Sequence, residues 1–325
     1  MQILDFDSQV FLAPMAGITD KPLRKLVHSF GKGNIVSEMV AINALERNNP
    51  KTSRIADVRD EPYPVTVQLV GGDALLFANA ARLAAELGAH NIDINMGCPV
   101  RKIVNNNSGS ALSKDLMMAA KIIDSTVKAT PLPVSVKFRL GWDHEHINAV
   151  EFAKMCEDSG ASYITVHGRT RSDFYSGNAN WDKIAEVKTA VKIPVVGNGD
   201  VTDGISARRM IDYTGVDAVM VGRATLGAPW LIAEIDKYLR HGECSPRKTA
   251  AEVKIILLNH IKGLYEYYGE RTALALSRKY VCWYSKGFHD AKHFREQYVK
   301  TNNFEDAFSV IDDYFDGLKE DTLCV

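Results

Sequence analysis

Polar side chains that could do chemistry recur at the ends of short apolar runs in this 325-residue chain. Lys137 and Arg139 alternate within one run, and Cys98 follows another, between Gly97 and Pro99. A buried ammonium group needs an anionic partner, so Lys137 indicates either an anionic cofactor or a lysine that forms a Schiff base. We favour a flavin, because a reduced flavin is negative near N1 and O2 and a nearby cation stabilises it.

Cys98 is a candidate proton donor. Gly97 and Pro99 restrict the backbone around it, so its thiol would point in a defined direction. A thiol with an ordinary pKa of about 8.5 stays mostly protonated at neutral pH, which suits a general acid. The alternative is a small buried apolar side chain, the usual role of a cysteine. The residue and its neighbours leave this choice open.

Glycines at the ends of two later runs indicate a phosphate site. Asn198, Gly199 and Asp200 end one run, and Gly222 and Arg223 end the next. Glycine lets backbone N–H groups approach phosphate oxygens closely, and an arginine can add a bidentate contact. The alternative is that both glycines only form tight turns.

Three further polar residues end apolar runs. Gln68 and Asn95 carry amide groups that suit the edge of a flavin or a pyrimidine. His167 could orient a ligand. Each of the three is equally compatible with a hydrogen-bonded polar group at the end of a strand.

The apolar runs alternate with stretches of helical periodicity, which predicts a parallel sheet with crossover helices. Eight such runs favour a closed (β/α)8 barrel over an open doubly wound sheet. The carboxyl ends of barrel strands meet at one face, so the polar residues above would gather there. The predicted strands are Val10–Ala16, Ile35–Val40, Val65–Gly71, Asn91–Gly97, Val134–Leu140, Tyr163–Gly168, Val195–Asp200 and Ala218–Gly222.

The barrel pattern ends near Leu226, and helical periodicity without strand-like runs follows. We predict a barrel domain over residues 1–240 and a helical domain over residues 241–325, with His241–Lys248 as a linker. An acidic outer helix facing water is expected over Glu305–Asp321.

The helical domain holds a basic stretch that predicts RNA binding. Residues 271–300 contain seven basic and two acidic residues, a local net charge of +5 in a chain of net charge −1. Basic side chains neutralise phosphates, and aromatic side chains can stack on unpaired bases. The alternative is a solvated helix face over a packed aromatic core. The interleaved aromatic residues are Tyr280, Trp283, Tyr284, Phe288, Phe294 and Tyr298.

Composition excludes several classes of protein. The five cysteines are widely spaced without a C-x-x-C pair, which disfavours a disulfide framework and a metal site and fits a reducing compartment. No apolar run reaches about 18 residues, and the N-terminus lacks a basic segment followed by an apolar one. We therefore expect a cytoplasmic protein that does not enter a membrane. We also expect it to be a monomer.

Several motifs, in the same order along the chain, resemble those of the tRNA-dihydrouridine synthases, most closely the bacterial B-type members. The similarity extends over nearly the whole chain. It departs at Val104–Gly109, where the family usually has basic or small residues, and matches again at Gly109–Leu112. The matching motifs are residues 13–20, 37–39, 95–99, 137–142, 167–171, 198–200 and 278–280.

The resemblance implies reduction of uridine to 5,6-dihydrouridine in tRNA, in the D-loop, with FMN as cofactor and NADPH or NADH as reductant. It implies that Cys98 is the general acid and Asn95 a uracil-side residue. The predicted FMN contacts are Pro14, Met15, Ala16, Gln68, Lys137, His167, Asn198, Gly199, Asp200, Gly222 and Arg223. The predicted RNA contacts are Asn95, Arg139, Arg171, Arg278, Lys279, Lys286 and Arg295.

In this interpretation hydride passes from the flavin to uracil C6, and Cys98 protonates C5. No G-x-G-x-x-G follows a predicted strand, so the nicotinamide cofactor would dock transiently over the flavin. Three alternatives remain. The chain could be a small-molecule flavin enzyme such as a dihydropyrimidine or dihydroorotate dehydrogenase, a colourless phosphate-binding isomerase or aldolase that uses Lys137, or a non-catalytic RNA-binding protein.

Overall fold

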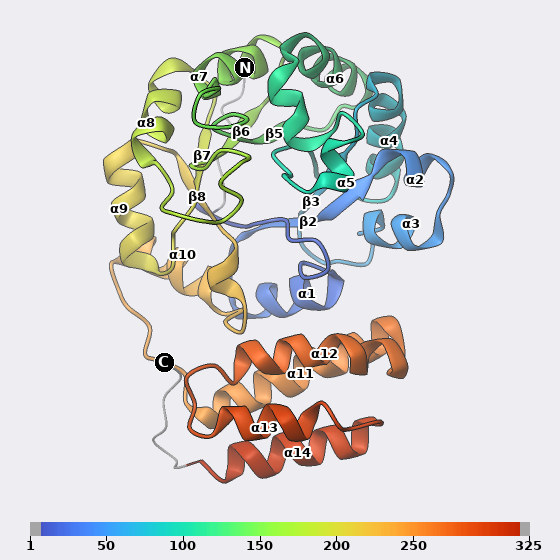
Figure 1. Ribbon diagram of the computed structural model, residues 1–325, viewed down its shortest axis with the longest axis vertical. Helices are drawn as coiled ribbons and strands as arrows, with labels where there is room; N and C mark the ends of the chain where they lie inside the picture. The colour runs from blue at the N-terminus through green and yellow to red at the C-terminus, as the bar shows by residue number, and fades with distance from the viewer. Residues whose placement is uncertain (1–7, 319–325) are drawn as a thin grey trace.

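Eight parallel strands close into a barrel in the computed structural model, which describes residues 8–318 (Figure 1). Neighbours in the barrel are neighbours in the chain, and the last strand pairs with the first. The predicted (β/α)8 fold is confirmed. The strands are β1 Val10–Leu12, β2 Asn34–Ala41, β3 Val65–Val70, β4 Asn91–Met96, β5 Val134–Arg139, β6 Tyr163–His167, β7 Val195–Asn198 and β8 Ala218–Val221.

The first strand ends earlier than predicted, at Leu12 instead of Ala16. The amide of Ala13 still donates to the carbonyl of Val221 at 2.8 Å. Pro14 has no N–H group and cannot extend the ladder, so the chain leaves the sheet there. The other seven strands begin and end within two residues of the predicted bounds.

Helices surround the barrel, and most of them begin at a side chain that caps the first turn. An Asp or Asn at the N-cap accepts a hydrogen bond from a backbone N–H that would otherwise have no partner. Such caps precede α1, α3, α4, α6, α8 and α9. The barrel helices are α1 Lys21–Phe30, α2 Ile42–Glu46, α3 Pro50–Ala56, α4 Ala74–Glu86, α5 Arg101–Val104, α6 Leu116–Ala129, α7 Ala149–Asp158, α8 Trp181–Ala190, α9 Gly204–Thr214 and α10 Leu231–His241.

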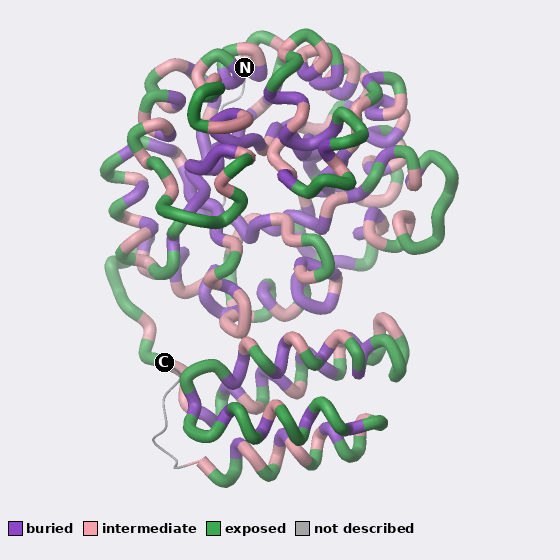
Figure 2. The backbone as a smooth tube through the Cα atoms, in the orientation of Figure 1, coloured by how far each residue is buried: buried purple, intermediate pink, exposed green. Residues whose placement is uncertain are grey.

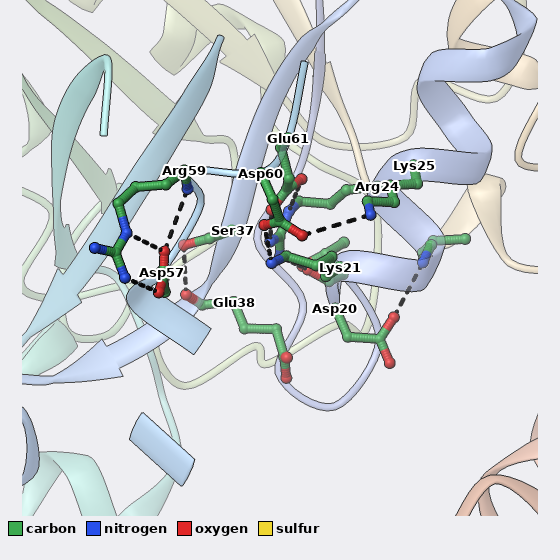
Figure 3. Close-up of polar contacts among 12 residues, drawn as sticks. Asp20, Lys21, Arg24, Lys25, Ser37, Glu38, Asp57, Arg59, Asp60 and Glu61 are labelled. Carbon is green, nitrogen blue, oxygen red and sulfur yellow. Dashed lines mark hydrogen bonds and ion pairs between the residues drawn. The ribbon is translucent and has the colours of Figure 1, made fainter. Parts of the chain in front are cut away.

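A buried ion pair ties α1 to the segment that precedes β3 (Figure 3). Arg24 Nε donates to Glu61 Oε2 at 3.1 Å, and the other end of its guanidinium group pairs with Glu61 Oε1. Tyr63 Oη donates to the same carboxylate at 2.7 Å. Arg24 also donates to the carbonyl of Thr19 at 2.8 Å. Removing either charge would leave the other buried and unpaired, so this pair fixes the end of the loop firmly.

Four helices form a separate bundle beside the barrel (Figure 1). They share a hydrophobic core, visible as the purple inner faces of the helices in Figure 2. Five of the six aromatic residues of the basic stretch lie in that core, so the alternative of packed aromatic side chains is correct for them. The helices are α11 Ala250–Tyr268, α12 Glu270–Tyr284, α13 Ala291–Tyr298 and α14 Phe304–Asp316. The five buried aromatic residues are Tyr280, Tyr284, Phe288, Phe294 and Tyr298.

The bundle contacts the barrel at the loop after β1. Tyr268 Oη donates to Asp20 Oδ2 at 3.0 Å, and Tyr280 Oη donates to the carbonyl of Ile18 at 3.4 Å. Lys279 Nζ donates to the carbonyl of Gly17. The helix α10 runs across the predicted division at residues 240 and 241, and the division itself stays a prediction.

The outer helix of the bundle carries acidic side chains, as predicted from residue 305 onwards. Glu305, Asp313 and Asp316 are exposed, and Asp312 is less so. Lys254 of α11 pairs with Asp312 and Asp316 at 2.8 Å each. The end of the predicted acidic helix and Cys324 lie outside the described residues. None of the helices described in residues 8–318 is long and apolar enough to cross a membrane.

Candidate active site

The carboxyl ends of the strands surround a cavity of about 610 Å³. Every predicted FMN contact lies in its wall, together with Asn95, Cys98 and Arg139. Arg171 does not line the cavity. The apolar part of the cavity wall includes Ile18, Met39, Val100, Met220 and Leu226.

The register of the strands places polar side chains next to one another. Asn95 is paired with Lys137 across β4 and β5, and Arg139 is paired with His167 across β5 and β6. His167 is paired in turn with Asn198 on β7. Alternate residues of a strand share a face, so Lys137 and Arg139 both project to the interior. The eightfold closure thus brings together residues that are far apart in the sequence.

Lys137 is a cation held by a neutral partner. Its Nζ donates to Asn198 Oδ1 at 3.0 Å, and Asn198 Nδ2 donates to the carbonyl of Met220 at 2.8 Å. Burial, and then the neighbouring Arg139, lower the pKa of Lys137 to about 8, and the Asp93 carboxylate opposes this shift. Within residues 8–318 no ion pair to Lys137 is found. Its charge is therefore available to an anionic ligand.

His167 is neutral in this environment. Burial is the main reason that its pKa lies well below the ordinary value, and the cations Lys137 and Arg139 lower it further. Arg169 Nη1 lies 3.4 Å from His167 Nε2. The imidazole therefore serves as a hydrogen-bonding group at neutral pH and not as a further cation.

Both backbone groups of Cys98 are held in place. Asn95 Oδ1 accepts hydrogen bonds from the N–H groups of Gly97 and Cys98 at 3.1 and 2.9 Å. The carbonyl of Cys98 accepts from the backbone N–H and the hydroxyl of Ser110 at 3.1 and 3.0 Å. Burial raises the pKa of the half-buried Cys98 thiol, so it remains protonated at neutral pH. A positioned, protonated thiol suits a proton donor.

Gly109 is required for this arrangement. Its φ of +59° lies in the left-handed region, and a Cβ atom there would meet the carbonyl oxygen of Cys98 at 2.8 Å. Only glycine fits both conditions. The stretch that departs from the family pattern therefore ends at a residue that packs directly on the cysteine.

The loops after β6 and β7 are joined by an ion pair that the sequence analysis did not identify. Arg169 is buried and donates to both carboxylate oxygens of Asp200 at 2.8 Å. Asp200 also accepts from the backbone N–H of Ala179 at 2.6 Å. The side chain of Asp200 thus fixes the loop, and only its backbone remains to meet a phosphate. An arginine two residues after His167, at the end of a strand, was the available signal.

Arg223 lies at the open edge of the cavity. Half of its side chain is exposed, and its guanidinium group lies 3.5 Å from Asp200 and 5.1 Å from the centre of the Tyr175 ring. Tyr175, which the sequence analysis missed, also stands next to His167 and Arg139. Arg223 is free enough to turn toward a ligand phosphate.

The two arginines of the barrel that are predicted to contact RNA differ in how many hydrogen bonds they make. Arg139 is buried and donates to the carbonyls of Gly97, Thr170 and Phe174 at 2.8 to 2.9 Å. Arg171 lies over the Trp142 ring at 4.4 Å, and its buried Nε has no hydrogen-bond partner within residues 8–318. Arg139 therefore supports the surrounding loops, while Arg171 retains a free donor. Both assignments stay predictions.

The four predicted contacts on the helical bundle also divide into two pairs. Arg278 and Lys286 are exposed, and no hydrogen bond or ion pair of their side chains is found in the described part of the chain. Lys279 reaches the barrel, and Arg295 Nε donates to Ser285 Oγ at 2.8 Å. Arg278 and Lys286 are the pair that is available to an external phosphate.

Comparison with known proteins shows the family of this chain. Residues 11–317 match the family model described as dihydrouridine synthase. The chain belongs to the dihydrouridine synthase family. It is 46% identical over 295 residues to a probable tRNA-dihydrouridine synthase from Rickettsia conorii, covering 90% of this chain and 88% of that one. It is 43% identical over 309 residues to tRNA-dihydrouridine synthase B from Pseudomonas aeruginosa, covering 95% and 93%.

The predicted resemblance to the dihydrouridine synthase family is confirmed, and so is the expectation that the chain is an enzyme. The alternative of a non-catalytic RNA-binding protein is wrong. Among solved structures, histamine dehydrogenase from a Rhizobium species is similar with a TM-score of 0.55 and 14% identity, covering 78% of this chain and 49% of that one. At this low identity the likeness shows a shared barrel fold.

Proposed function

We propose that this dihydrouridine synthase reduces uridine to 5,6-dihydrouridine in the D-loop of tRNA, with bound FMN and with NADPH or NADH as reductant. The observation that carries the proposal is that one cavity holds Lys137, a cation without an ion pair among residues 8–318, and Cys98, a positioned thiol. The names of the relatives support tRNA as the substrate. We also propose that the enzyme acts as a monomer in the cytoplasm.

The residues of the cavity fit FMN. Lys137 offers a positive charge without a paired carboxylate in the described residues, as an anionic ring system requires. Pro14, Met15 and Ala16 provide an apolar wall. Gly199, Gly222 and Arg223 lie at the ends of β7 and β8, where such barrels usually bind phosphate, and would hold the ribityl phosphate. FMN supplies hydride when it is reduced.

The reduction needs one hydride at uracil C6 and one proton at C5. Cys98 is the group that delivers the proton, because its thiol is protonated and its backbone is held on both sides. Lys137 stabilises negative charge in the cavity, and neutral His167 contributes hydrogen bonds without adding a competing cation. The target uridine must leave its stack to reach the cavity, as bases acted on by enzymes generally do.

The direct test is the flavin content and product of the purified full-length protein. We expect a yellow protein with one FMN per chain that converts uridine to dihydrouridine in unmodified tRNA when NADPH is present, mapped by sequencing. Uracil and dihydroorotate without tRNA should not be turned over. Turnover of a free pyrimidine but not of tRNA would establish the small-molecule alternative. A colourless protein that cannot be reconstituted with FMN would contradict the flavin proposal.

The affinity of the flavin-free protein for FMN should depend on pH through Lys137. Its pKa of about 8 means that the ammonium form prevails below pH 8 and is lost above it. Binding should therefore weaken by up to about tenfold per pH unit above that point. Fluorescence titration of FMN measures this dependence.

The Lys137→Met variant should bind FMN more weakly and lose this pH dependence. Lys154→Met, at an exposed position on α7, is the matched control and should behave as the unaltered protein does. An identical pH dependence in Lys137→Met would show that another group binds the flavin ring.

A further inference from the structure

Asp93 is a buried carboxylate that lies beneath the cavity and not in its wall. It sits on β4 with 3% of its surface exposed. Gln68 Nε2 donates to its Oδ2 at 2.6 Å, and Ser135 Oγ donates to its Oδ1 at 2.7 Å. Burial raises its pKa. Nothing in the proposed reaction uses this acid directly.

A series of hydrogen bonds connects Asp93 to the reactive cysteine. Gln68, which donates to Asp93, accepts from Asn95 Nδ2 at 2.8 Å. Asn95 accepts in turn from the N–H groups of Gly97 and Cys98. We name the three side chains Asp93, Gln68 and Asn95 the amide relay. All three are at least nine-tenths buried, so solvent does not replace these bonds.

The direction of the amide relay follows from its two ends. A backbone N–H can only donate, so Asn95 must turn its oxygen toward Cys98 and its nitrogen toward Gln68. Gln68 must then turn its oxygen toward Asn95 and its nitrogen toward Asp93. A carboxyl oxygen can accept this hydrogen bond, and Asp93 Oδ2 does so at 2.6 Å. Without an acceptor at position 93, the Gln68 amide would lose the contact that fixes its orientation.

The orientation also decides what Asn95 offers to a ligand. Its oxygen already accepts two hydrogen bonds, while only one of its two amide hydrogens is used by a partner in residues 8–318. Asn95 lines the cavity, so it presents a donor there and no free acceptor. A donor suits a ring carbonyl of uracil, whereas the exocyclic amino group of cytosine would bring two donors face to face.

We propose that Asp93 is a positioning residue that acts through Gln68 and Asn95 to hold the backbone of Cys98 and to turn Asn95 as a donor toward a pyrimidine carbonyl. The uracil part of this inference rests on the proposed function. The part that concerns Cys98 can be measured without RNA.

Two substitutions at position 93 distinguish the effect of losing the hydrogen-bond acceptor from the effect of losing the negative charge. Leucine is close to aspartate in shape but offers no acceptor, whereas Asp93→Asn keeps an oxygen that accepts from Gln68 and an amide that can donate to Ser135. In the flavin-loaded full-length protein, Asp93→Leu should slow the oxidation of reduced flavin by tRNA up to about 10²-fold, as small misplacements of reacting groups do. Asp93→Asn should stay within about threefold of the unaltered rate. Reduction of the flavin by NADPH should be equal in the two variants, because both remove the carboxylate that supports the charge of Lys137.

Alkylation of Cys98 by iodoacetamide, followed by mass spectrometry, gives a second readout. In Asp93→Leu the loop is released, so Cys98 should react several times faster, while the exposed Cys244 and Cys282 keep their rates. Asp93→Ser, whose hydroxyl is too short to reach Gln68, tests the same loss if the leucine variant does not fold.

Asp236→Leu is the control for a lost buried carboxylate. Asp236 lies on α10, where it accepts from Ser8 and pairs with Arg240, and it does not line the cavity. This variant should be less stable without any change in Cys98 alkylation or in oxidation of the flavin by tRNA.

Three results bear on the proposal. Unchanged flavin oxidation and Cys98 alkylation in Asp93→Leu and Asp93→Ser would overturn it. Equal loss in Asp93→Asn and Asp93→Leu would also overturn it, because charge and not the relay would then matter. If the unaltered protein makes no dihydrouridine but the alkylation rates differ as expected, the proposed function fails while the positioning of Cys98 is supported.

Discussion

Replacing Cys98 by alanine should lower the rate of dihydrouridine formation by about 10²–10⁴-fold, the usual contribution of a general acid. FMN should remain bound and reducible by NADPH, because only the second half-reaction uses the proton. Anaerobic stopped-flow absorbance follows the two half-reactions separately: flavin reduction by NADPH, then flavin oxidation by tRNA. The effect should fall entirely on the second.

Cys244→Ala provides the matched control, since this cysteine is exposed in the segment before α11. It should leave both half-reactions unchanged. If the Cys98→Ala variant turns over tRNA at the unaltered rate, Cys98 is not the proton donor and serves only as a small packing side chain. The flavin proposal would survive that result, because it depends on Lys137 and the phosphate loops.

Substituting alanine for Arg278 and Lys286 together should weaken tRNA binding and flatten its dependence on salt. Each neutralised phosphate contributes about 0.7–0.9 to the slope of log K against log salt, so two contacts should lower the slope by about 1.4–1.8. Both side chains are exposed and unpaired within residues 8–318, so the fold should not depend on them. Fluorescence anisotropy with labelled tRNA at several salt concentrations measures the slope.

The pair Lys279 and Arg295 should behave differently. Lys279 holds the barrel loop at Gly17, and Arg295 bonds Ser285, so alanine at these positions should lower the melting temperature more and the salt slope less. Lys121 and Lys128, exposed on α6, form a control pair with the same change in net charge. An unaltered slope in the Arg278 and Lys286 variant would mean that RNA is held elsewhere, by barrel loops around Arg101, Lys102 and Arg171.

Local pattern was enough to predict the barrel and the strand ends at which the cavity-lining residues lie. Apolar runs with helical periodicity between them predict a parallel sheet with crossover helices, and eight such runs favour a closed barrel. The end of a strand is also a local property, which is why Lys137 and Asn198 were assigned to one face before their contact was known. The error at β1 has a local cause as well, since Pro14 ends the ladder where hydrophobicity continues.

Tertiary contacts decided which polar groups are free to act. Arg139, Arg169 and Lys279 each carry a charge that the sequence presents as available, yet each donates to a carbonyl or carboxylate on a different loop. The partner of Lys279 is Gly17, 262 residues away. A hydrogen bond depends on distances of a few tenths of an ångström, and the order of residues sets no such distance until the barrel closes. The amide relay that ends on Cys98 arises for the same reason, because β3 and β4 must pair before Gln68 can meet Asp93.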